Sequence, residues 1–124
     1  MHANPQSQYL ENAVLSASPV KIIVMLYDGA IRFCQRAKAA GAAKDAAEMG
    51  RLLSKAHDVI AELQAVLDMK RGGTIAKDLA RVYEYALWRL SDARMRRDVA
   101  AIDDVMRVLQ PLKESWDDLA RRGA

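Results

Sequence analysis

The sequence predicts an all-α protein: an antiparallel four-helix bundle with an N-terminal extension that is itself a candidate for a short extra helix. Alanine and leucine, with 22 and 13 residues, outnumber valine, isoleucine and threonine, with 9, 6 and 1, which favours helices over sheets. Apolar residues recur at three- and four-residue spacing along four stretches, as on helices with one buried face. Four helices of about 30 Å, joined by short turns, pack most economically as an antiparallel bundle.

The chain is expected to form a single helical domain, residues 19–124, after an N-terminal cap segment, residues 1–18. A length of 124 residues suits one domain, which buries roughly two-thirds of its unfolded surface. Ser18 is a candidate N-cap, and Pro19 suits the first helical position because its missing N–H is not needed there.

Residues that start or stop helices suggest where the four helices end. The helices are expected at residues 19–40, 44–69, 74–97 and 99–121. Gly41 stops the first, and Gly72–Gly73 breaks the second. Thr74 and Asp98 are the expected N-caps of the last two helices. Pro111 lies inside the fourth helix and is expected to kink it.

Each helix has an expected core face. Its residues are Ile23, Leu26, Tyr27, Ala30, Cys34 and Ala37; then Met49, Leu52, Leu53, Ala56, Val59, Ile60, Leu63, Val66 and Leu67; then Leu79, Tyr83, Ala86, Leu87, Leu90 and Ala93; and finally Ile102, Val105, Met106, Leu109, Leu112, Trp116 and Leu119. These positions recur with the period of a helix that buries one face.

Composition and charge argue against several functional classes. The net charge of +3 is too small to imply nucleic-acid binding, and no run of 18 apolar residues exists that could insert in a membrane. Cys34 is the single cysteine, so it cannot form an internal disulfide, which fits a cytoplasmic location. With two histidines and one cysteine the chain lacks the ligands of a zinc site. We therefore expect no catalytic residues, no metal and no cofactor.

His57 provides the alternative hypothesis of a signalling bundle. Histidine phosphotransfer domains are four-helix bundles with one solvent-facing histidine, and His57 falls at the margin of an apolar stripe. Asp58 and Val59 follow it in place of the lysine and glycine that such sites use to stabilise a phosphate. A boundary histidine without chemistry is the favoured interpretation. A generic helical adaptor for some other client is a further alternative.

The first helix carries more apolar residues than one core face requires. Ile22, Met25 and Phe33 lie between the core stripe and the polar strip, and they surround Gly29. Glycine inside a helix costs about 1 kcal/mol relative to alanine. Its place suggests that another helix approaches closely there, although the N-terminal segment or a bundle helix could equally cover this flank.

Two large aromatic residues of the third helix point away from its core face. With Leu79 at 0°, Tyr85 falls near about 240° and Trp88 near about 180°. Exposed aromatic residues are typical of partner surfaces. We therefore expect both residues to contact another protein.

Short motifs along the chain resemble those of a known family. They are SASP at 16–19, MLYDGAIRF at 25–33, LDM at 67–69, GG at 72–73, IAKDL at 75–79, VYEY at 82–85 and KESW at 113–116. Their order and spacing are similar to those of the flagellin export chaperones, the FliS family. The chain departs from that pattern at Trp88, Arg94 and Lys113, and Pro111 adds a kink.

This resemblance implies a non-enzymatic cytosolic chaperone that binds the C-terminal segment of flagellin, prevents premature polymerisation and delivers it to the flagellar type III export gate. It also implies that an N-terminal segment with a tyrosine corresponding to Tyr9 lies over part of the apolar surface. We keep a homodimer as a candidate state of the chain without client. The expected partner-binding residues are Tyr9, Val14, Ile22, Met25, Gly29, Phe33, Tyr85 and Trp88.

Overall fold

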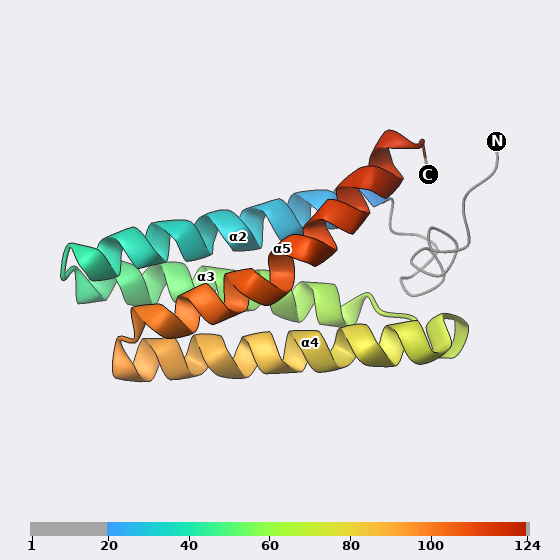
Figure 1. Ribbon diagram of the computed structural model, residues 1–124. Coiled ribbons are helices and arrows are strands. Elements are labelled where there is room, and N and C mark those ends of the chain that lie inside the picture. The colour runs from blue at the N-terminus through green and yellow to red at the C-terminus, as the bar shows by residue number, and fades with distance from the viewer. Residues whose placement is uncertain (1–19, 124) are drawn as a thin grey trace.

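A computed structural model describes residues 20–123 of the chain, in which four helices follow one another as an antiparallel bundle (Figure 1). The helices are α2 (Val20–Ala42), α3 (Ala46–Ala65), α4 (Met69–Arg96) and α5 (Val99–Arg121). The predicted all-α bundle is confirmed. The expected cap segment, with the candidate cap Ser18 and Pro19, lies outside the described residues.

The helices are arranged so that α2 and α4 occupy diagonal corners of the bundle. Helix α2 packs mainly against α3 and α5, and α4 packs mainly against the same two helices. The ribbon of α5 changes direction about halfway along, and its second half turns away from α4 (Figure 1). Pro111 lies near the middle of α5, which confirms the expected kink, since proline cannot donate to the helical ladder and crowds the preceding turn.

Aspartate caps, rather than glycines, determine where three of the helices begin. The side chains of Asp45, Asp68 and Asp98 accept hydrogen bonds from backbone N–H groups of the first turns of α3, α4 and α5. The predicted cap Asp98 and the bounds of the fourth helix are confirmed. The connections before α3 and α4 differ from the predicted ones, because the sequence analysis did not recognise Asp45 and Asp68 as caps.

The two expected glycine breaks have different outcomes. Gly41 lies inside α2, which continues to Ala42, and the chain turns at Lys44, whose φ is 60°. Helix α3 ends at Ala65, before the expected Met69, and Asp68 starts a first turn of α4 at Met69. Gly73, with φ 52° and ψ −130°, is non-helical and separates this turn from the rest of α4, which confirms the predicted break. Such a backbone conformation is accessible essentially to glycine alone. The expected cap at Thr74 stays a prediction.

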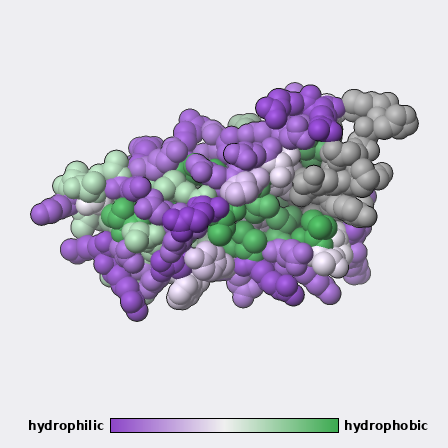
Figure 2. All heavy atoms as spheres, viewed as in Figure 1, coloured by the Kyte–Doolittle hydropathy of each residue, from purple (hydrophilic) through white to green (hydrophobic). Residues whose placement is uncertain are grey.

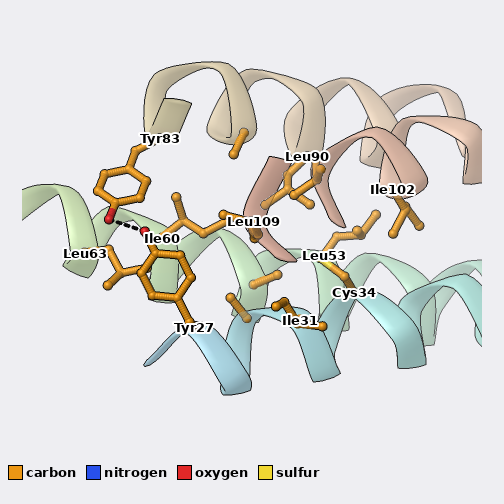
Figure 3. Close-up of a cluster of buried hydrophobic side chains, with 14 of the residues drawn as sticks. Tyr27, Ile31, Cys34, Leu53, Ile60, Leu63, Tyr83, Leu90, Ile102 and Leu109 are labelled. Atoms are coloured by element: carbon orange, nitrogen blue, oxygen red, sulfur yellow. Dashed lines mark hydrogen bonds between the residues drawn. The ribbon is translucent and has the colours of Figure 1, made fainter. Parts of the chain in front are cut away.

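The core agrees with the helical periodicity. Most expected core residues are buried, and those at the edges of the stripes are partly buried: Leu26, Val59, Val66, Leu67, Leu87, Met106 and Leu112. Ile31 is also buried, although no face was assigned to it. Tyr27 and Tyr83 meet across the diagonal of the bundle and share a hydrogen bond between their hydroxyl groups (Figure 3).

Two glycines of α2 are expected to respond in opposite ways to alanine. A Cβ at Gly29 would meet no atom within 4 Å, whereas a Cβ at Gly41 would lie 2.9 Å from Val99 Cγ2 and 3.0 Å from Met49 Sδ. Gly29→Ala should raise the free energy of unfolding by about 1 kcal/mol through helix propensity. Gly41→Ala should lower it, because overpacking costs about 1–3 kcal/mol. Urea unfolding of both variants checks this, and two changes of equal sign would contradict it.

Candidate functional site

An exposed apolar strip follows one flank of α2, and we call it the α2 surface: Ile22, Met25, Gly29 and Phe33. The side chains of Ile22 and Met25 are 48% and 70% exposed. Phe33 is partly buried against the core, and the Arg36 guanidinium carbon lies 6.0 Å from its ring centroid. Because helical positions three and four apart share a face, these residues form one continuous strip.

The α2 surface is indented at Gly29. No atom of the described chain approaches within 4 Å of the place where a Cβ would stand, so no other described helix packs on the backbone there. The hypothesis that a helix of the bundle packs closely on Gly29 is therefore wrong for the described residues. Close helix packing occurs at Gly41 instead, against Val99 and Met49.

The predicted exposure of the two aromatic residues of α4 is confirmed, and we call them the α4 aromatic pair. Trp88 is 61% and Tyr85 39% exposed, with ring centroids 6.3 Å apart. The guanidinium carbon of Arg89 lies 5.5 Å from the Trp88 centroid. Arg89 also donates hydrogen bonds to Asp92 at 2.8 Å and to Asp104 of α5 at 2.6 Å.

These ion pairs hold in place the arginine that lies over Trp88. The hydrogen bond from Arg89 lowers the pKa of the Asp104 carboxyl below its ordinary value, so the ion pair between α4 and α5 stays charged at neutral pH. Arg89 is thereby tied to both helices and covers part of Trp88 as a cation over a ring. An aromatic group fixed in this way loses little conformational freedom when a partner covers it.

The α2 surface and the α4 aromatic pair lie on different sides of the bundle. Helices α2 and α4 are diagonal, and both sets of residues point away from the buried core. The structure therefore separates residues that sequence reasoning had grouped as one set. Tyr9 and Val14, the remaining members of that set, lie outside the described residues.

A further apolar region was not foreseen. Figure 2 shows hydrophobic residues gathered at the centre of one face, where α5 turns away from α4 in the same view of Figure 1. The two helices carry partly buried apolar residues, among them Ile75, Val108 and Leu112. Pro111 is the sequence signal that could have indicated this region, because a kinked α5 cannot follow α4 along its whole length.

The residues considered for chemistry do not assemble a catalytic centre in the described chain. Burial raises the pKa of the Cys34 thiol to about 12, so the nucleophilic thiolate is suppressed. His57 is partly buried and lines a small hollow between α3 and α4 with Asp58 and Arg94. Within residues 20–123 no group of three histidine, cysteine, aspartate or glutamate side chains could hold a metal ion. No described helix has both the length and the apolar character for crossing a membrane.

Comparison with known proteins decides the family. The model of the flagellar protein FliS family matches residues 2–123. The chain belongs to the FliS family. It is 38% identical over 116 residues to the flagellar secretion chaperone FliS of Salmonella typhimurium, an alignment covering 93% of this chain and 86% of that protein.

Two other FliS relatives show similar agreement. Identity is 34% over 110 residues with FliS of Vibrio cholerae, covering 89% of this chain and 81% of the relative. It is 33% over 115 residues with FliSB of Pseudomonas aeruginosa, covering 93% and 91%. Both relatives are flagellar secretion chaperones.

Proposed function

We propose that this chain is a cytoplasmic export chaperone that binds the C-terminal helical segment of flagellin, keeps it from polymerising early and delivers it to the flagellar type III export gate. The observation that supports this most directly is the α2 surface. It is apolar, exposed and indented at Gly29 on a chain of the FliS family. The chain acts by binding, without catalysis.

The mechanism that this surface supports is masking. A flagellin helix that lies along α2 exchanges its contacts with other flagellins for contacts with Ile22 and Met25. Full burial of such side chains is worth roughly 1.5–3 kcal/mol each. A client that orders on binding loses conformational entropy, so a large interface is needed. The α4 aromatic pair is a second area that a long client can reach, or the docking place of an export-gate component.

The indentation at Gly29 favours a helical client. Without a Cβ, the backbone of α2 offers a site where a second helix axis can come close, which increases dispersion contacts along the crossing. From the family resemblance we also propose Tyr9 and Val14 as contacts of the client. The client then either displaces residues 1–18 or is held by them.

Calorimetric titration with a synthetic flagellin C-terminal peptide tests the proposal. Saturable one-to-one binding is expected, with a negative heat-capacity change from apolar burial. No binding would contradict the function and favour a generic adaptor for another client. Transfer of radiolabelled phosphate to the chain, abolished by His57→Gln, would instead support the phosphotransfer hypothesis.

Acrylamide quenching tests whether the client also covers the α4 aromatic pair. Trp116 is fully buried, so in the free chain the quencher reaches mainly Trp88. If the peptide covers Trp88, its quenching should fall on complex formation, and Trp88→Ala should weaken binding by about 1 kcal/mol or more, as for a hot-spot residue. Unchanged quenching in the saturated complex would assign this pair to a second partner.

A further inference from the structure

One residue of the α2 surface, Met25, exposes an oxidisable sulfur atom to water. Met25 is 70% exposed, and helical spacing places it beside Ile22 and one turn before Gly29. The thiol of Cys34, by contrast, is fully buried. An oxidant dissolved in water therefore reaches the Met25 thioether more readily than this thiol, because oxidation of sulfur-containing side chains follows their exposure.

The other methionines within residues 20–123 differ from Met25 in burial or in surroundings. Met49 is only 3% exposed, and Met106 is partly buried against the core. Met95 and Met69 are 84% and 47% exposed, but both lie on α4 and are followed directly by exposed cationic side chains. In the described chain Met25 is thus the exposed methionine whose neighbours form an apolar strip.

Oxidation would change the character of this side chain from apolar to polar. A peroxide transfers one oxygen atom to the thioether sulfur of Met25: the O–O bond breaks, an S–O bond forms and, from hydrogen peroxide, one water molecule leaves. The product is methionine sulfoxide, whose oxygen accepts hydrogen bonds. Beneath an apolar helix this oxygen would lose its water without gaining a donor, and burial of an unpaired polar group is unfavourable.

We propose that Met25 is a reversible oxidation site that switches the α2 surface between a client-binding and a weakly binding state. The inference rests on the proposed function, because it assigns a form of regulation to the same surface. Reduction by a thiol-dependent methionine sulfoxide reductase reverses the switch: two thiols join in a disulfide, and the sulfoxide oxygen leaves as water. Since Met25 lies outside the buried core, the switch acts on the surface and leaves the stability of the bundle unchanged.

Calorimetric titration before and after mild treatment with hydrogen peroxide tests this. The full chain is oxidised, freed of peroxide and titrated with a flagellin C-terminal peptide that carries norleucine in place of any methionine. Mass spectrometry should find sulfoxide at Met25 and Met95, while Met49 stays unmodified. The oxidised chain should bind about tenfold more weakly, and sulfoxide reductases for both epimers, supplied with dithiothreitol, should restore the affinity. A Met25 that stays unmodified while Met95 is oxidised would overturn the proposal.

Met25→Leu and Met95→Leu are the matched pair of variants. Leucine keeps the volume and the apolar character of methionine, so both variants should bind the peptide as the unaltered chain does before treatment. After peroxide, Met25→Leu should keep its affinity, whereas Met95→Leu should lose it as the unaltered chain does. Met25→Gln places a polar group of similar length on the surface, and it should bind weakly without any peroxide.

The outcomes separate this inference from the proposed function. If the untreated chain does not bind the peptide, the proposed function fails, and the switch fails with it. If the untreated chain binds and full oxidation of Met25 leaves the affinity unchanged, the switch alone is overturned. The same holds if Met25→Leu still loses affinity after peroxide. Thermal melts of the oxidised and untreated chains should coincide, and a lower melting temperature would attribute the lost affinity to the fold and overturn the switch.

Discussion

The combined substitution of Ile22→Asp and Met25→Asp is expected to weaken binding of a flagellin C-terminal peptide tenfold or more, with little change in thermal stability. Both side chains are exposed in the free chain, so charging them leaves the core intact. In the complex each carboxylate would be buried against an apolar helix without a partner, and an unpaired buried charge is strongly unfavourable. Calorimetric titration measures the affinity, and thermal melts monitored by circular dichroism measure the fold.

Two further variants of α2 show whether a loss of affinity arises at the α2 surface itself or from added negative charge on the helix. Gln35→Asp adds a negative charge at an exposed position of the same helix outside the α2 surface, and it should bind as the unaltered chain does. Gly29→Leu fills the indentation while making the surface more apolar, so it should stabilise the helix and still weaken binding. Stronger binding by Gly29→Leu would show that the client does not approach the α2 backbone. Wild-type affinity in the double aspartate variant would place the client elsewhere.

The existence of the helices and their buried faces could be predicted because burial of an apolar stripe imposes the 3.6-residue period directly on the sequence. The residues at which the helices begin and end were harder to predict. Between α3 and α4 the adjacent glycines correctly indicated a break, which the structure has at Gly73. The helical turn before that break was missed; it begins at Met69 because the carboxylate of Asp68 satisfies two backbone N–H groups. Which of several candidate caps is used depends on tertiary packing, and periodicity does not encode this.

The candidate site could be predicted residue by residue but not as a surface. Periodicity correctly showed that Met25 and Trp88 point away from the core, because exposure depends on position around a single helix axis. Whether two such residues share a face depends on how the helices are arranged around the core. The diagonal placement of α2 and α4, which separates them, is a property of the bundle.

Raising the pH above about 9 is expected to unfold the chain steeply. Burial raises the pKa of the Cys34 thiol from 9.0 to about 12 and that of the Tyr27 phenol from 10.0 to about 12. Burial also raises the pKa of Tyr83 well above its ordinary value. In the unfolded chain these groups ionise near pH 9 and 10, whereas in the folded chain they stay neutral. The unfolded state therefore binds fewer protons in this range, and stability decreases as pH rises.

The size of this effect is large compared with the stability of a small domain. Each pKa unit corresponds to about 1.4 kcal/mol, so Cys34 and Tyr27 together withdraw several kcal/mol by pH 12, against a total of roughly 5–15 kcal/mol. Urea unfolding at a series of pH values measures the slope, in concentrated salt that screens the exposed lysine salt bridges. Cys34→Ala should reduce the slope between pH 9 and 10 and retain the tyrosine contribution, which grows above pH 10. A free energy of unfolding that stays constant up to pH 11 would show that Cys34 and the tyrosine pair are open to water. Rapid reaction of the native thiol with a disulfide reagent would show the same for Cys34.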